Sequence, residues 1–308
     1  MTFPLFPFYP LLMNVRQWKL ARRMLPIGER TLVMGIINLT PDSFSRDGLQ
    51  SSLERACELA RRMIDDGADI IDIGGESTRP GAQSITVEEE IERIAPFLDL
   101  IVESGNGAGE ADRTVPFSID TTKSEVARFA LHAGVEIVND ISGLRFDPAL
   151  ADVTSEAQAG LILMHSRGAF ETMHRLEPVE EIITEVTESL RRSIEEAERR
   201  GVERARIALD PGIGFSKSQQ QNLELIAKLD QLACAFPEFP LLVGTSRKSF
   251  IGRLLDGAPV DQRLHGTMAT VAAAVLGGAH IVRVHDVRAA VETVRVVDAI
   301  KNAVEQSE

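Results

Sequence analysis

Short apolar runs alternate with helix-patterned stretches along residues 32–285. Eight of these runs are continuously apolar rather than alternating, which is typical of parallel strands covered on both sides. They read LVMGIIN, DIIDIGGEST, PFSID, VEIVND, GLILMH, RIALD, LLVGTSRKS and HIVRVH. Strands that alternate with helices along a whole chain predict an α/β fold, and eight of them predict a (β/α)8 TIM barrel of roughly 250 residues.

The stretches between the runs carry the spacing of helices with one buried face. In residues 53–66 the apolar positions are Leu53, Ala56, Cys57, Ala60, Met63 and Ile64. Gly67 follows them, as a glycine often does at the end of a helix. The same pattern predicts helices over 181–200 and 220–233.

An open, doubly wound sheet is the alternative architecture. It is disfavoured because no GxGxxG motif opens a helix after the first strand. Candidate site residues also follow nearly every strand, whereas an open sheet gathers them at one switch point. We therefore expect a single barrel domain over residues 30–303, an N-terminal extension over 1–29 and a short tail over 304–308.

The N-terminal extension has an unusual composition. Its apolar segment TFPLFPFYPLLM contains three prolines and is shorter than the ~20 residues that a membrane-spanning helix needs. The basic segment VRQWKLARRM comes next. We expect a flexible extension, or a start at Met13 or Met24, with a transit peptide as the alternative. No other segment is long and apolar enough to predict a membrane span.

Composition narrows the classes of partner. A net charge of −13 argues against nonspecific binding to nucleic acid or to an anionic membrane. The two cysteines, Cys57 and Cys234, lie in helical patterns and are expected to be buried apolar residues. They predict no disulfide framework, which fits a reducing compartment, and we expect a cytoplasmic protein.

Polar residues follow the predicted strands at the end where the strands of a barrel converge. Asp120 and Asp210 end the third and sixth strands, and Asn139 ends the fourth. Carboxylates beside an amide suit a planar heterocycle rich in N–H groups, such as an aminopyrimidinone. Two alternatives stay open: a structural role, in which the carboxylates cap helix N-termini or pair with Arg247 or Lys248, and a divalent metal site built from the two aspartates.

Two further loops offer candidate ligand contacts. NLTPDSFSRDG begins at Asn38 and carries Phe44, an aromatic residue in a polar loop. GGESTRPG contains two glycines that let the backbone approach a ligand, followed by Ser77, Thr78 and Arg79. The second loop is therefore a candidate anion-binding loop.

Cationic residues follow the last two strands. Arg247 and Lys248 come after the seventh strand, and Arg283 and His285 after the eighth. Phosphate sites of these barrels frequently lie there. The segregation predicts a substrate with a hydrogen-bonding heterocycle at one end and a phosphate or pyrophosphate at the other.

Seven strings, in this order, resemble the dihydropteroate synthase family: MGIINLTPDSFS, DIGGESTRPGA, SIDTTKSEVA, VNDISGLR, LDPGIGFSKS, LLVGTSRKSFIG and GAHIVRVHDV. They cover most of the predicted barrel. The resemblance implies a TIM-barrel enzyme, usually a homodimer. It would join p-aminobenzoate to a dihydropterin methyl pyrophosphate with Mg²⁺, giving dihydropteroate and pyrophosphate.

The resemblance also implies roles for residues at matching positions. The pterin would be held by Asp120, Asn139, Asp210 and Lys248. The phosphates would be bound by Arg283, His285, Arg79 and Thr78. The p-aminobenzoate pocket would be shaped by Phe44, Pro80 and Ser249, and the protein ligand of Mg²⁺ would be Asn38. Catalysis would fall to Asp120, Asp210, Lys248 and Arg283.

The chain departs from the family pattern in three places. The usual SFSDGG is SFSRDG here, so Arg46 takes the aspartate position and Asp47 lies one residue later. The usual LMHMRG is LMHSRG, with Ser166 for methionine, which leaves Met164 as the methionine able to wall the pterin pocket. The usual GFGK is GFSK, with Ser216 for glycine.

Two rival functions remain. A pterin-binding methyltransferase partner would hold a pterin in a similar barrel, but it needs no pyrophosphate site, so SRKSF and RVHDV argue against it. A non-catalytic pterin-binding paralogue would be marked by the loss of residues from the first two loops or from the basic set, and within those only Arg46 is out of pattern. Val294, Val297 and Ile300 on the last helix are either interface or core.

Overall fold

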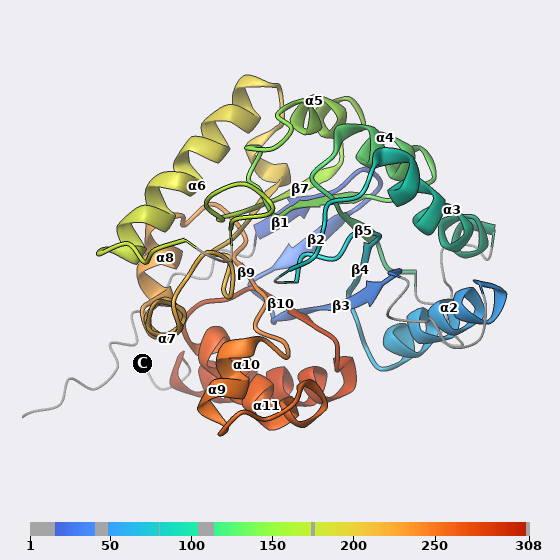
Figure 1. Ribbon diagram of the computed structural model, residues 1–308. Coiled ribbons are helices and arrows are strands. Elements are labelled where there is room, and N and C mark those ends of the chain that lie inside the picture. The colour runs from blue at the N-terminus through green and yellow to red at the C-terminus, as the bar shows by residue number, and fades with distance from the viewer. Residues whose placement is uncertain (1–15, 41–48, 80, 104–113, 174–175, 306–308) are drawn as a thin grey trace, which may run out of the picture.

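The computed structural model describes residues 16–40, 49–79, 81–103, 114–173 and 176–305 (Figure 1). Its main sheet consists of eight parallel strands: β3 (Leu32–Asn38), β4 (Ile70–Gly74), β5 (Phe117–Asp120), β6 (Ile137–Asp140), β7 (Gly160–Met164), β8 (Ile207–Asp210), β9 (Leu242–Val243) and β10 (Ile281–Val284). The strand order is β8-β7-β6-β5-β4-β3-β10-β9. A parallel bridge from Leu209 to Leu241 brings the two edges together, so the predicted (β/α)8 barrel is confirmed.

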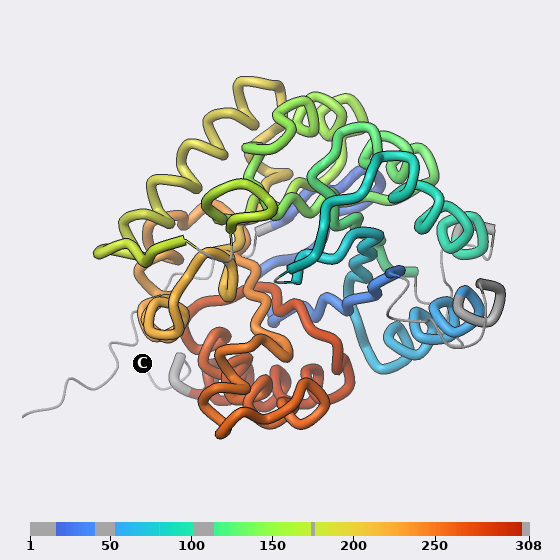
Figure 2. Tube along the Cα trace, viewed as in Figure 1, coloured from blue at the N-terminus to red at the C-terminus, as the bar shows by residue number. Residues whose placement is uncertain are grey.

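Helices form the outer ring of the barrel (Figure 1). They are α2 (Leu49–Asp65), α3 (Val87–Glu103), α4 (Ser124–His132), α5 (Ala149–Glu156), α6 (Ile182–Arg199), α7 (Gln219–Ala227), α8 (Leu229–Ala235), α9 (Ser249–Leu254), α10 (Leu264–Leu276) and α11 (Val287–Glu305), with short 3-10 turns η1 (Arg204–Arg206) and η2 (Val260–Gln262). Figure 2 shows the chain passing once around the ring, so its first and last parts meet where β3 pairs with β10. No helix of the described residues is long and apolar enough to cross a membrane.

Two helical predictions need correction. The helix expected over 220–233 is two helices, α7 and α8, because Lys228 between them leaves the helical conformation at φ −114° and ψ 26°. Cys57 is buried as expected, but Cys234 on α8 is exposed. The apolar pattern continues across Lys228 and Cys234, so it indicated neither the break between the helices nor the exposure of the cysteine.

An N-terminal hairpin closes the amino-terminal end of the barrel. Strands β1 (Arg16–Lys19) and β2 (Met24–Ile27) pair antiparallel. Trp18 is fully buried, and its indole N–H donates to the carbonyl of Arg206 at 2.8 Å. A side chain at Gly160, where β7 begins, would lie only 2.6 Å from Leu20, so the glycine makes room for the hairpin.

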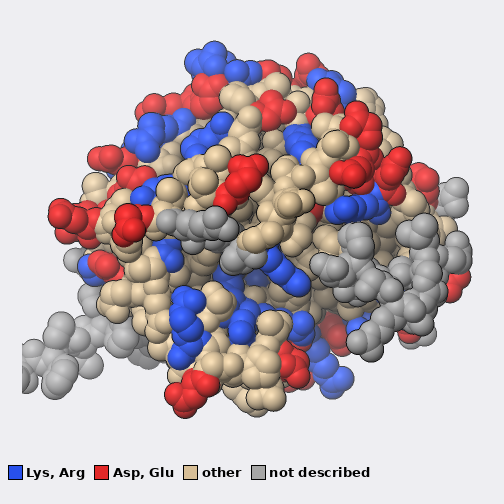
Figure 3. Space-filling view, viewed as in Figure 1, with Lys and Arg blue, Asp and Glu red and all other residues tan. Residues whose placement is uncertain are grey.

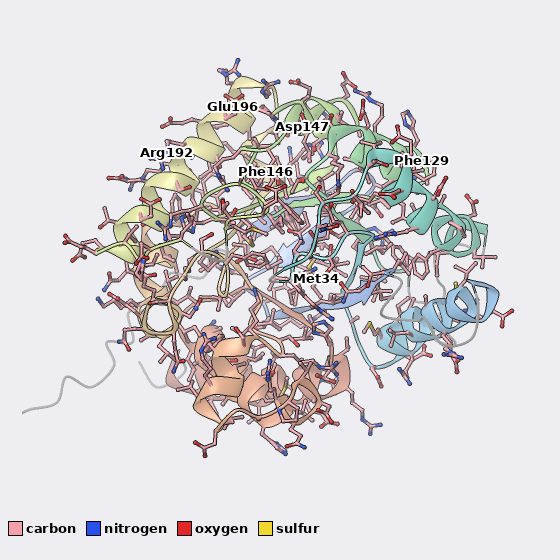
Figure 4. The ribbon with its side chains drawn as sticks, in the orientation of Figure 1. Met34, Phe129, Phe146, Asp147, Arg192 and Glu196 are labelled. Carbon is pink, nitrogen blue, oxygen red and sulfur yellow. The ribbon has the colours of Figure 1, made fainter. Side chains whose placement is uncertain are left out.

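The hairpin packs onto the apolar interior of the barrel, with Met34 at its centre (Figure 4). Trp18, Leu20 and Ile27 join the inward-facing residues of seven strands in this cluster. The expectation of a flexible extension is therefore wrong for residues 16–29, because burial of a tryptophan on the barrel orders them. Residues 1–15 lie outside the described part of the chain.

Candidate active site

Three strands meet through the guanidinium of Arg283 at the carboxyl end of the barrel. On β10, Arg283 donates from Nε to Oδ2 of Asp72 and from Nη2 to Oδ2 of Asp120, both at 2.7 Å. Asn139 donates to the same oxygen of Asp72 at 3.3 Å. The structure thus brings together Asp120, Asn139 and Arg283, which are separated in sequence but were expected to share one site.

Asp72 is the member of this group that sequence reasoning missed. It lies in the middle of β4 and is fully buried. The available signal was an acid inside the continuous apolar run DIIDIG, because a buried charge needs a partner. That partner is Arg283, whose single positive charge faces two carboxylates.

The imbalance of charge affects Asp120. Burial raises the pKa of Asp120 to about 7; Arg283 opposes this rise, and the nearby carboxylate of Asp72 adds to it. The two carboxylates favour the charged form of Arg283, against the effect of burial, and its pKa rises. The cluster therefore contains one permanent cation and a carboxyl group that titrates near neutral pH.

Asp210 and Lys248 form the second charged group of the barrel mouth. Asp210 ends β8, accepts a hydrogen bond from the amide of Gly212 at 2.7 Å, and has a pKa raised by burial. Lys248 donates to the carbonyl of Ile213, and its ammonium lies 4.2 Å from the ring centroid of Phe215. Burial lowers the pKa of Lys248 to about 8, although Asp210 favours its charged form.

An apolar wall adjoins these charged groups. Ile141, Met164 and Met173 form a buried cluster, against which Phe170 and Phe215 pack. Met164 thus lies in an apolar wall beside the charged groups. It is the methionine that the sequence left as the candidate for a wall of the pterin pocket. This wall follows β6, β7 and β8, so it lies on the side of the mouth that carries Asn139 and Asp210.

The expected cationic side of the mouth is present, but not all of its charge is free. Arg247 forms a double hydrogen bond with Asp286, at 3.0 and 2.6 Å. His285 shares a hydrogen bond of 3.0 Å with the Ser246 hydroxyl, and burial together with Arg247, Arg283 and Arg79 lowers its pKa to about 3. At neutral pH His285 is a neutral imidazole and contributes hydrogen bonding rather than charge.

Lys and Arg side chains gather in the middle of the face shown in Figure 3, over β9, β10 and α9, while Asp and Glu surround them. The protein as a whole carries a net charge of −13. The barrel mouth is therefore a local basic region on an acidic protein, which suits an anionic small molecule.

A buried ion-pair network supports the second loop, which carries Thr78 and Arg79. The ammonium of Lys123 bonds to Glu76 at 3.0 Å and to Glu90 at 2.6 Å. Glu76 also accepts from the hydroxyl of Ser84 and the amide of Ile85, at 3.0 and 2.7 Å. Thr78 is half-buried and Arg79 is exposed just beyond this anchored base.

The remaining predicted residues divide into two groups. Asn38 ends β3. A Cβ atom added at Gly74 would lie 3.8 Å from the side-chain oxygen of Asn38 and 3.7 Å from the Cβ of Asp120. Both residues therefore border the mouth. Ser249 begins α9, is exposed, and accepts a hydrogen bond from Arg253 at 3.4 Å. Phe44 and Pro80 lie outside the described residues, as do Arg46 and Asp47.

A family model described as "Pterin binding enzyme" matches residues 34–285, which is most of the chain. The chain belongs to the pterin binding enzyme family. The dihydropteroate synthase of Synechocystis is 47% identical over 273 residues, which cover 89% of this chain and 91% of the relative.

Solved structures of this pterin-binding family share the fold. One is the Xanthomonas albilineans dihydropteroate synthase with 4-aminobenzoic acid, at a TM-score of 0.83 and 38% identity, covering 92% of this chain and 98% of the other. Another is the Burkholderia cenocepacia dihydropteroate synthase with 7,8-dihydropteroate, at 0.81 and 37%, covering 95% and 99%. The likeness extends over nearly the whole of each chain.

Proposed function

We propose that this protein is a dihydropteroate synthase, a transferase of folate biosynthesis. It condenses p-aminobenzoate with (7,8-dihydropterin-6-yl)methyl diphosphate and releases pyrophosphate. The observation that carries the proposal is the division of the barrel mouth into a buried carboxylate and amide set and a cationic set. Relatives named dihydropteroate synthase, at 42–47% identity over nearly nine-tenths of the chain, support the same reaction.

The pterin end of the substrate fits the carboxylate side. An aminopyrimidinone offers parallel N–H donors to Asp210 and a donor–acceptor edge to Asn139. Lys248 donates to a ring acceptor, and the wall of Ile141 and Phe215 covers a face of the heterocycle. Once the diphosphate begins to leave, Asp120 and Asp210 stabilise the electron-poor pterin methylene.

The diphosphate end fits the cationic side. Arg283 spans both sets, because it lies against Asp72 and Asp120 and is a neighbour of His285. Arg79 and Thr78 come from the second loop, and His285 supplies hydrogen bonding. These groups stabilise the negative charge that grows on the leaving group as the carbon–oxygen bond breaks.

The amine of p-aminobenzoate is already a nucleophile, so this mechanism requires no serine or cysteine nucleophile. Its nitrogen forms the new bond to the methylene carbon and then loses a proton. Closure of the first two loops positions the amine and excludes water. Phe44, Pro80 and Ser249 are the residues proposed to shape its pocket.

Mg²⁺ fits the donors of this mouth as a metal held mostly by substrate. Magnesium keeps several waters and typically binds one or two protein oxygens plus phosphates. Asn38 offers one amide oxygen at the mouth, and the described residues contain no cluster of three or more His, Cys, Asp or Glu that could hold a metal alone. When bound, the metal would neutralise diphosphate charge.

We also propose a cytoplasmic homodimer. Six of the eight exposed large hydrophobic residues in the described chain lie on the segment from α9 to α11: Leu254, Leu255, Val260, Leu276, Val296 and Ile300. Val294 and Val297 are core, whereas Ile300 is 54% exposed. Sedimentation at micromolar concentration should give twice the 33.7 kDa of one chain, and replacing Val296 and Ile300 with Glu should give monomers.

The direct test mixes the purified protein with the dihydropterin diphosphate, p-aminobenzoate and Mg²⁺, and follows dihydropteroate by chromatography. We expect metal-dependent product. Asp210→Ala should weaken binding of the pterin substrate by about 2–5 kcal/mol, as truncation of a buried charged hydrogen-bond partner does. Pterin binding without product would favour the non-catalytic paralogue, and unchanged pterin affinity in the variant would refute the assignment of Asp210.

A further inference from the structure

Two serines at the barrel mouth bond to the backbone of neighbouring loops. Ser166 follows β7, and Ser216 lies between β8 and α7. We propose that they are positioning residues, which clamp the β7–α6 loop between its two neighbours and so pre-order the pterin subsite. This inference rests on the proposed function.

Ser216 forms a clasp with Arg167 of the β7–α6 loop. Its hydroxyl accepts a hydrogen bond from the amide of Arg167 and donates one to the carbonyl of the same residue, both at 3.0 Å. The Arg167 guanidinium in turn donates to the carbonyl of Ser216 at 2.9 Å. Three hydrogen bonds therefore join two residues that are 49 positions apart.

The backbone of Ser216 shows that this clasp overrides a local preference. Its φ is +53°, in the left-handed region that favours glycine and strains an L-residue. Glycine would adopt this conformation freely. Ser216 is buried, with 4% of the residue exposed. The two hydrogen bonds of its hydroxyl offset the strain.

Ser166 ties the other side of the same loop. Its buried hydroxyl donates to the carbonyl of Ile141 at 2.7 Å and accepts from Nη2 of Arg145 at 2.9 Å. Arg145 also donates to the carbonyl of Gly168 at 2.9 Å. The β7–α6 loop is thus bonded to the loop after β6 on one side and to the loop after β8 on the other.

Both clamps act on residues that border the pterin subsite. Ser166 holds the carbonyl of Ile141, whose side chain belongs to the apolar wall, two residues after Asn139. Ser216 directly follows Phe215, whose ring packs on that wall and contacts the Lys248 ammonium. Ordering these residues before the ligand arrives lowers the entropic cost of binding, so the clamps should increase pterin affinity.

The test compares Ser216→Gly, Ser216→Ala and Ser166→Ala in the full chain, measuring the KM for each substrate, kcat and the melting temperature. Loss of the hydrogen bonds should raise the KM for the dihydropterin diphosphate about threefold to tenfold in each variant. The KM for p-aminobenzoate should not change. Ser216→Gly should keep the wild-type melting temperature because glycine relieves the strain, whereas Ser216→Ala should lower it.

Ser155→Ala is the matched control, because that hydroxyl also bonds to a distant carbonyl, at Gly201, but lies on α5 away from the mouth. It should leave both KM values unchanged. An unaltered pterin KM in Ser216→Gly, or an equal rise for both substrates, would overturn the inference. Wild-type protein that fails to bind the pterin would instead overturn the proposed function on which the inference depends.

Discussion

The two ends of this barrel contain opposite kinds of side chain, apolar at one end and charged at the other. At the amino-terminal end, Trp18, Leu20 and Ile27 plug the interior with apolar side chains. At the carboxyl end, the strands of the barrel present Asp72, Asp120 and other charged groups, paired across the barrel. Burial of the apolar residues at the amino-terminal end lowers the free energy without requiring a particular geometry, whereas each buried charge at the carboxyl end needs a partner of its own. Stability and chemistry are thereby assigned to different ends.

Arg283→Met should break this separation most severely, because it leaves Asp72 and Asp120 buried beside each other without a cation. Removal of one partner of a buried ion pair typically lowers the free energy of unfolding by about 3–5 kcal/mol. We also expect loss of dihydropteroate formation. Urea unfolding measures the first effect; Arg288→Met is the control, since its pair with Glu292 is exposed and should contribute less than about 1 kcal/mol.

Trp18→Ala should affect the amino-terminal end of the barrel instead. It leaves a cavity in the plug and should lower the free energy of unfolding by about 3–5 kcal/mol. Where the variant remains folded, kcat and both KM values should match the wild type. Met24→Ala on the same hairpin is the control, because Met24 is 56% exposed. A large rise in the pterin KM of Trp18→Ala would show that the two ends are not independent.

A smaller effect should appear in the pH dependence of pterin binding. Below about pH 7 Asp120 is protonated and loses an acceptor oxygen, and above about pH 8 Lys248 loses its charge. Affinity for hydroxymethyl-dihydropterin, which has no titrating phosphate, should therefore peak between these values. It should fall up to about tenfold per pH unit on either side. Calorimetric titration of wild type and Asp120→Asn would check this, since the variant should lose the acid limb.

The same pKa shift acts on stability with the opposite sign. The folded protein keeps a proton on Asp120 that the unfolded chain releases near its ordinary pKa of 3.8. Between these pH values the folded state binds more protons, so the contribution of Asp120 to folding is largest in acid and declines as pH rises toward 7. A wild-type unfolding free energy with no greater loss over this range than that of Asp120→Asn would contradict the shift.

The sequence predicted the mouth better than the base because the two leave different traces. Strand ends such as Asp120 and Asp210 are polar residues directly after apolar runs, so their convergence follows from the barrel itself. The base depends on one tryptophan in a basic, proline-flanked segment whose partner is 188 residues away. No local pattern encodes that contact, so the segment was expected to be flexible.

Asp72, Lys123 and Ser216 illustrate a second limit. Each lies in a stretch whose local pattern has an ordinary explanation: a strand, a helix start and a turn. Their importance comes from side-chain partners on other elements, at Arg283, Glu90 and Arg167. Periodicity gives the face of an element but not the residue opposite it, so these networks required the structure.

The burial of Trp18 against a residue far along the chain has a consequence for the nascent polypeptide. Its hairpin is synthesised before the strands of the barrel, yet the carbonyl that accepts its indole N–H belongs to Arg206. At translation rates of roughly 5–20 residues per second, about 10 to 40 seconds separate the two. Throughout that interval the indole N–H lacks its acceptor, so the tryptophan cannot reach its buried position until most of the barrel has been synthesised.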